Sequence, residues 1–130
     1  MRAKDLPRGR SELAAAVDLV IGLTSQTFGV SRCELLAKSR SQTEIAFARQ
    51  VAMYLVHVVF GQSFRDTGEA FGRERTTVAY ACSLVEDKRD DLAFDRQLDA
   101  IEDSLKRLWA IERLRRVRLC HRSAEGLVAA

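Results

Sequence analysis

The side chains best suited to contacting another molecule lie in the segment RERTTVAY, residues 73–80. At about 100° per residue, Thr76, Thr77 and Tyr80 share one face of a helix. The opposite face is apolar and is made of Val78, Ala81, Cys82, Val85 and Leu92. A tyrosine and two threonines that face outward beside Arg73 and Arg75 need a polar partner. The segment therefore predicts a helix that buries one face and offers the other for binding.

The residues before this segment predict a shorter helix and a turn. Ser63 and Asp66 form a capping box, so the short helix covers about residues 64–70, and Gly72 can end it. A short helix, a glycine turn and a helix with an outward polar face make the helix-turn-helix pattern, whose second helix enters the major groove of DNA. The alternative is an ordinary helical corner that only meets water, because this geometry has no rigid sequence code.

Three further helices are predicted upstream. Ser11 is expected to cap a helix over residues 11–28 that ends at Gly29, and Ser31 with Glu34 forms a capping box for a short helix to about residue 37. A third helix over residues 44–60 is expected to bury Phe47, Val51, Tyr54, Leu55 and Val58. Its polar face then carries Arg49, Gln50, Met53 and His57.

A long C-terminal helix is predicted from a cap at Asp95 to about residue 119. Its apolar residues near helical spacing are Leu98, Ile101, Leu105, Leu108, Ile111 and Leu114, with Trp109 alongside. This stripe either folds back on the first helix or joins two chains as a homodimer. Arginines crowd the second half of the helix, as a solvated face or as a second contact for DNA or a partner. The expected division is a basic arm (1–10), a helix-turn-helix domain (11–93), the long helix (94–122) and a tail (123–130).

Composition agrees with one all-α domain that needs neither metal nor cofactor. The chain has 130 residues, one proline and a net charge of +3, which permits nucleic acid binding without demanding it. Cys33, Cys82 and Cys120 form no metal-binding pattern, and Cys33 and Cys82 are expected to be buried. Neither a catalytic constellation nor a membrane segment is present, so we expect a cytoplasmic protein that is not an enzyme and has no small-molecule substrate.

Residues 28–89 resemble the C-terminal DNA-binding domain, domain IV, of the bacterial replication initiator DnaA. The resemblance lies in FGVSRCELLAKSRS (28–41), ARQVAMYL (48–55) and SFRDTGEAFGRERTTVAYAC (63–82). It implies a TrpR-like helical fold and recognition of the short duplex sites called DnaA boxes. It also implies that Arg40 reaches the minor groove from a basic loop, and that Arg49, Gln50 and residues 73–77 touch the backbone or the bases.

The sequence also departs from the family pattern. The family usually has His where Arg75 stands and Pro where Ala48 stands, and its loop is commonly basic where Gln42, Thr43 and Glu44 occur here. Nothing resembles the ATPase domain of the initiator, and no GxxxxGK[ST] loop occurs. The base preference of Arg75 therefore stays open.

These observations predict sequence-specific binding to double-stranded DNA by a nucleoid-associated protein that regulates transcription or replication initiation without its own ATPase. The candidate DNA-binding residues are Lys38, Arg40, Arg49, Gln50, His57, Arg65, Arg73, Arg75, Thr76, Thr77 and Tyr80. His57 is either a phosphate contact or an ordinary surface histidine. The alternative function is a degenerate helix-turn-helix that serves as a protein adaptor.

Overall fold

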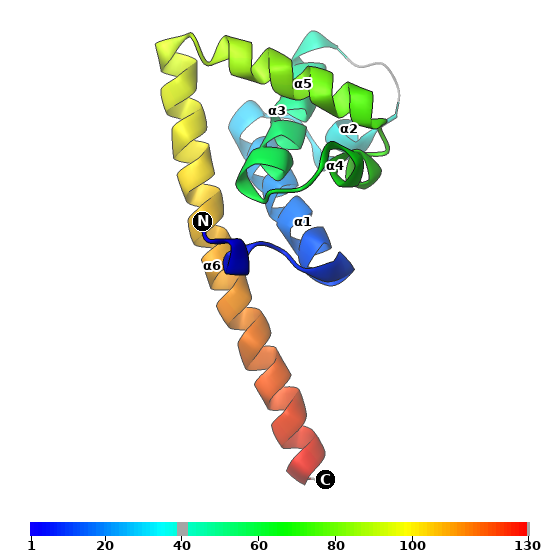
Figure 1. The fold of residues 1–130 in the computed structure, drawn as a ribbon, viewed down its shortest axis with the longest axis vertical. Helices are drawn as coiled ribbons and strands as arrows, with labels where there is room; N and C mark the ends of the chain where they lie inside the picture. The colour runs from blue at the N-terminus through cyan, green and yellow to red at the C-terminus, as the bar shows by residue number, and fades with distance from the viewer. Residues whose placement is uncertain (39–41, 130) are drawn as a thin grey trace.

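A computed structural model describes residues 1–38 and 42–129, with side chains described up to residue 122. Over these residues the chain forms a short 3-10 turn and six α-helices, with no strand, which confirms the all-α class (Figure 1). The elements are η1 (Ala3–Asp5), α1 (Gly9–Phe28), α2 (Arg32–Leu36), α3 (Thr43–Val59), α4 (Phe64–Phe71), α5 (Arg75–Lys88) and α6 (Leu92–Ala129). None of the described helices is both long enough and apolar enough to cross a membrane.

Helix α3 is the central helix of the core. It packs against α1, α2, α4, α5 and α6, and most of its length is buried. Two expectations for α3 are wrong: Met53, placed on the polar face, is buried, and Val58, placed in the core, is 44% exposed. A helix surrounded on several sides has no wide polar face, so an amphipathic pattern locates its solvent side poorly.

Of the two predicted capping boxes, the serine N-caps are confirmed. The Ser31 hydroxyl accepts a hydrogen bond from the amide of Glu34 at 3.1 Å, and Ser63 accepts one from Asp66 at 3.0 Å. They satisfy amide groups in the first turns of α2 and α4, which have no carbonyl partner within the helix.

Two other expected caps are wrong. Helix α1 begins at Gly9 instead of Ser11, where the Arg8 amide donates to the Glu12 carboxylate at 2.6 Å. Helix α6 begins at Leu92, because the Asp91 carboxylate accepts from the amides of Ala93 and Phe94 at 3.0 and 3.4 Å. Asp95, the expected cap, is engaged by an arginine instead.

That arginine, Arg89, fixes the corner between α5 and α6. Its guanidinium contacts the carboxylates of Asp95 at 2.6 Å, Asp99 at 2.5 Å and Glu102 at 2.7 Å. It also donates to the Tyr54 hydroxyl of α3 at 3.0 Å. Burial lowers the pKa of Arg89, but its hydrogen bonds to Asp95, Tyr54 and Glu102 outweigh burial and raise that pKa well above its usual value. Arg89 therefore ties three helices together with its charge retained.

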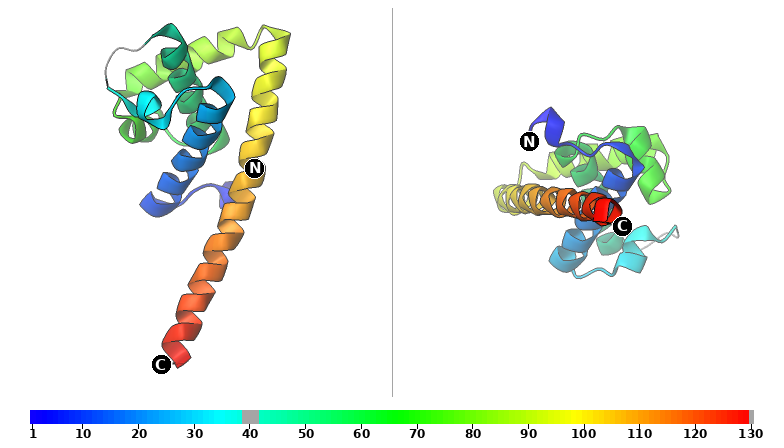
Figure 2. Two further views of the ribbon diagram at one scale, coloured as in Figure 1. Left: turned by 180° about the vertical axis from the view of Figure 1, so that it is seen from behind. Right: turned by 90° about the horizontal axis from the view of Figure 1, so that it is seen from below.

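The first half of α6 completes the core. Its inward side chains, Leu98, Ile101, Leu105 and Trp109, are buried where α6 packs on α1 and α3. The expectation that this helix folds back on the first helix is thus correct up to Trp109. Beyond that point α6 projects away from the body (Figures 1 and 2), and it continues to Ala129, so residues 123–129 are helical where a tail was expected.

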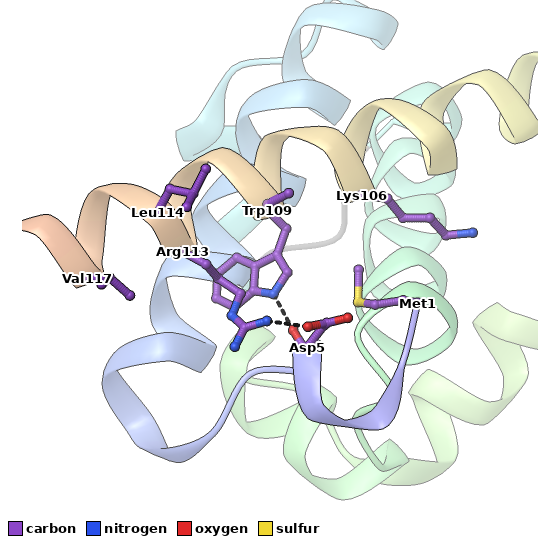
Figure 3. Close-up of a pocket in the computed structure, with 8 residues that line it drawn as sticks. Met1, Asp5, Lys106, Trp109, Arg113, Leu114 and Val117 are labelled. Atoms are coloured by element: carbon purple, nitrogen blue, oxygen red, sulfur yellow. Dashed lines mark hydrogen bonds and ion pairs between the residues drawn. The ribbon is translucent and has the colours of Figure 1, made fainter.

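The N-terminal arm is held against α6. The indole Nε1 of Trp109 donates a hydrogen bond to the Asp5 carbonyl at 2.6 Å, and the Asp5 carboxylate pairs with Arg113 at 2.6 Å (Figure 3). Arg116 reaches the start of α1 and donates to the hydroxyl and carbonyl of Ser11. These contacts hold α6 in place where its projecting segment begins.

Candidate nucleic-acid interface

Helices α4 and α5 are joined by a tight turn that sets their relative position. Gly72 ends α4 in the left-handed conformation, with φ of 65°. The Arg73 amide then donates to the Gly68 carbonyl at 2.8 Å. A Cβ at position 68 would lie 2.4 Å from the Arg73 carbonyl oxygen, so only glycine lets the turn approach α4 this closely. Sequence reasoning missed Gly68, although a glycine inside a predicted helix is the signal for such an approach.

The orientation of α5 agrees with its predicted faces. Arg75, Thr76 and Thr77 are exposed, and Tyr80 is 64% exposed. The inward residues Val78, Ala81, Cys82 and Val85 are all buried. Leu92 was wrongly grouped with them: it begins α6 and is 64% exposed. One face of α5 is thus buried in the core, and the opposite face presents polar side chains to solvent.

The end of α2 lies beside the helix-turn-helix turn. Arg73 is half-buried and donates from Nη2 to the Ala37 carbonyl at 2.8 Å. The Lys38 side chain lies next to Gly72, since its Cε would be 3.4 Å from a Cβ at that glycine. The structure therefore brings Lys38, Arg73 and Arg75 to one end of the motif. Arg40, expected to reach the minor groove, lies outside the described residues.

Arg49 occupies a different place from the one expected. It is only 7% exposed, and its guanidinium donates to the carbonyls of Leu35 at 2.8 Å and Glu34 at 2.7 Å. Burial, and then the charge of Arg73, lower the pKa of Arg49. The expectation that Arg49 lies on an open polar face is wrong, because carbonyls at the end of α2 need donors and Arg49 supplies them.

The remaining candidates lie on α3 and at the start of α4. Gln50 is half-buried. The His57 ring stacks on Phe64, with centroids 4.3 Å apart, and its Nδ1 donates to the Gln62 carbonyl at 2.6 Å. Only Nε2 of His57 then remains to meet a phosphate. Arg65 is exposed and lies 3.6 Å from Glu69.

The cysteines do not gather into a site. Cys82 is buried as expected, and burial, with a smaller effect of Glu86, raises the pKa of its thiol to about 11. Cys33, expected to be buried, is exposed, because only Leu35 of α2 turns into the core. No cluster of three or more His, Cys, Asp or Glu side chains able to hold a metal occurs among the described residues.

The arrangement suits the recognition of an anionic polymer. Exposed guanidinium and hydroxyl donors stand at the N-terminal end of α5, where the helix dipole and open amides favour negative charge. A helix with one exposed side also fits the major groove of a duplex, which admits an α-helix.

Known proteins are similar to this chain in sequence. Residues 17–85 match the family described as the bacterial DnaA protein helix-turn-helix. The chain is 34% identical over 100 residues to the chromosomal replication initiator protein DnaA of Lachnoclostridium phytofermentans, covering 75% of this chain and 22% of that protein. It is 40% identical over 77 residues to DnaA of Lactococcus lactis subsp. cremoris, covering 58% and 17%. It is 31% identical over 103 residues to DnaA 2 of Chlamydia pneumoniae, covering 78% and 23%. The chain thus spans about a fifth of the length of these curated relatives.

Proposed function

The chain belongs to the bacterial DnaA helix-turn-helix family, and from this we propose that it binds double-stranded DNA with sequence specificity through α5. The observation that carries the proposal is the outward face of α5. Arg75, Thr76, Thr77 and Tyr80 are exposed on a helix whose other face is anchored in the core. In this proposal those four side chains enter the major groove.

Within this proposal the contacts divide by their chemistry. Arg75 stands in the first turn of α5, where a guanidinium can pair with the O6 and N7 atoms of guanine. Arg65 on α4, Arg73 in the turn and Lys38 beside the motif carry charges that suit phosphates, which fix position without reading sequence. Gln50 and His57 are further contacts from α3, and Arg40 is a further contact that the resemblance implies. Arg49 acts indirectly, because it holds the end of α2 that carries Lys38.

The proposed biological role is regulation of transcription or replication initiation at the nucleoid, with DnaA boxes among the candidate sites. The relatives are named as chromosomal replication initiators, which supports a role near replication. In this proposal residues 11–93 form the DNA-binding unit and residues 94–122 an accessory helix. No ATP hydrolysis and no small-molecule substrate are assigned to these residues.

A protein adaptor is the second candidate, and the projecting part of α6 favours it. Ile111 and Leu114 are 63% and 64% exposed there. Exposed apolar side chains that lie next to one another mark sites of protein–protein contact. The two candidates differ in their response to salt. DNA binding weakens steeply as salt rises, because neutralised phosphates release counterions, whereas apolar capture of a protein changes little.

Selection of bound fragments from random duplex DNA tests the proposed function. We expect one enriched motif, bound more tightly than random DNA in a fluorescence anisotropy titration. Arg75→Ala and Thr77→Ala should reduce that preference, while Arg96→Ala, an exposed arginine on α6, should not. Absence of enrichment, together with salt-independent capture of a protein, would reject the DNA-binding proposal.

A further inference from the structure

The His57 side chain is held in one orientation where α3 meets the start of α4. Its ring stacks on Phe64, the first residue of α4, with centroids 4.3 Å apart and planes 28° apart. Its Nδ1 lies 2.6 Å from the carbonyl oxygen of Gln62 in the connecting loop. In the described part of the chain, no hydrogen bond reaches the other ring nitrogen, Nε2.

The Gln62 carbonyl decides which ring nitrogen carries the proton of neutral His57. A carbonyl oxygen can only accept a hydrogen bond, so Nδ1 must be protonated to make this contact. In the neutral ring Nε2 then has a lone pair and no proton. The phosphate oxygens of DNA also only accept hydrogen bonds. A phosphate can therefore bind Nε2 only when His57 is protonated on both nitrogens.

The position of His57 suits a contact with the DNA backbone. In a helix-turn-helix the second helix enters the groove, while the first helix crosses the backbone. The first helix here is α4, and His57 packs on its first residue. Phe64 is 37% exposed and His57 is half-buried, so the stacked pair lies at the surface. The positive end of the α4 dipole and the exposed Arg65 also favour an anion there.

The ionisable groups near His57 come from other parts of the fold. Between Arg49 and Arg65 the sequence has no other charged residue. The surrounding elements carry these ionisable groups near the end of α3: Tyr54 of α3, Arg65, Asp66 and Glu69 of α4, Arg89 of α5, Glu102 and Lys106 of α6, and Met1 and Asp5 of the arm. In the described part of the chain, no carboxylate among them lies within 4.0 Å of a His57 ring nitrogen. A DNA phosphate would therefore be the first anion to pair with this ring.

We propose that the binding of duplex DNA by this chain is coupled to protonation of His57, so that DNA affinity falls as the pH rises through neutrality. The inference rests on the proposed function, because it needs a DNA phosphate at the start of α4. Charged His57 donates from Nε2 to that phosphate, while Nδ1 keeps its bond to Gln62. An anion beside a histidine favours the charged form. Because this coupling is reciprocal, a proton on His57 strengthens DNA binding.

The composition of the chain makes this coupling simple to assign. Histidine is the side chain whose charge changes between about pH 5 and 8, and the chain has two, His57 and His121. His121 is exposed on the projecting part of α6. His121→Gln is therefore the matched control, since it removes the same type of group away from α4. The amino terminus titrates near the upper end of this range, but all variants share it.

Fluorescence anisotropy titrations of the full chain test the coupling, with a labelled duplex that carries the selected motif and constant ionic strength. Between about pH 5.5 and 8, wild-type affinity should fall by roughly tenfold, because a charge-assisted hydrogen bond is lost. His57→Gln cannot gain a proton and His57→Lys stays charged, so both should lose this pH dependence. His57→Lys should also keep high affinity at the upper pH. His121→Gln should behave as the wild type.

The salt dependence of the wild type gives a second measurement that needs no variant. The slope of log affinity against log salt should be steeper by roughly one unit at about pH 5.5 than at pH 8, since one more phosphate is neutralised. Equal slopes at the two pH values would overturn the proposal. Thermal melts at both pH values show whether each variant is folded.

Two other results would also overturn the coupling. One is a His57→Gln variant whose affinity depends on pH as steeply as that of the wild type. The other is a His57→Gln variant that loses only melting temperature, which would leave the ring with a purely structural role at Gln62. Sequence-specific binding that does not change with pH would reject the coupling and keep the proposed function. Absence of DNA binding at every pH would reject both.

Discussion

The amide of Arg73 lies 2.8 Å from the carbonyl oxygen of Gly68, so the turn of the helix-turn-helix is hydrogen-bonded directly to the helix before it. The Arg73 carbonyl in turn occupies the space that a side chain at position 68 would need. Arg73 also reaches Ala37 at the end of α2. This one approach therefore positions the start of α5 against both α4 and α2.

A methyl group at position 68 should separate these elements. Gly68→Ala would place Cβ 2.4 Å from a backbone oxygen, and we expect a loss of roughly 1–3 kcal/mol in the free energy of unfolding. Gly22→Ala is the matched control, since its Cβ would meet only the end of Arg32 at 3.8 Å. That control should be neutral or stabilising by about 0.5–1 kcal/mol. Urea unfolding measures both, and equal effects would contradict the close approach.

The two faces of α5 should respond differently to substitution. Thr77→Ala and Tyr80→Ala remove exposed side chains and should weaken DNA binding with little change in melting temperature. Val78→Asp buries an unpaired charge at a fully buried position and should destabilise the fold by roughly 4 kcal/mol or more. Anisotropy titrations and thermal melts separate the two effects. Similar loss of stability in both sets would show that the exposed face supports the fold instead.

Two cations near the turn should differ in what they control. Lys38→Gln removes an exposed charge, so affinity should fall on every DNA sequence and the salt slope by roughly one unit, with stability unchanged. Arg49→Gln should mainly reduce stability, because the carbonyls of Glu34 and Leu35 lose a buried donor. An Arg49 variant with full stability but a reduced salt slope would make Arg49 a direct phosphate contact.

Loss of the Arg75 side chain should reduce affinity for the selected DNA motif more than affinity for random DNA. If its guanidinium pairs with a base edge, Arg75→Ala should cost about 1–3 kcal/mol on the selected motif and much less on random duplexes. Competition titrations with both DNAs give this difference directly. A uniform loss on the two would assign Arg75 to the phosphates.

The buried thiol of Cys82 should make stability fall at alkaline pH. Its pKa is about 11 in the fold and 9.0 when unperturbed, so in this range the unfolded chain loses the proton first. The contribution of the protonated Cys82 thiol to the free energy of unfolding is complete below pH 9. It is lost as pH rises toward 11, by about 2–3 kcal/mol in total. Cys82→Ala should flatten this part of the curve in urea unfolding at several pH values. An unchanged slope in the variant would assign the loss to other groups.

The sequence predicted well what depends on local spacing. The helical phase that exposes Thr76 and Tyr80 and buries Val78 follows from the period of the helix alone. The Ser31 and Ser63 caps follow from a hydroxyl three residues before the amide it meets. Such interactions form within one or two turns and need no knowledge of the rest of the chain.

Only the tertiary structure decided which polar residues are already engaged. The sequence placed Arg49 on a polar face, but a face becomes buried when another segment packs over it, and here the end of α2 does so. Aspartate is a preferred N-cap residue, yet the Asp95 carboxylate pairs with Arg89, and Asp91 caps α6 instead. These outcomes depend on contacts between elements, whose geometry no local period contains. The two faces of α5 were thus determined by sequence spacing. For α3, the packing of the surrounding elements decided which side chains remain available to DNA.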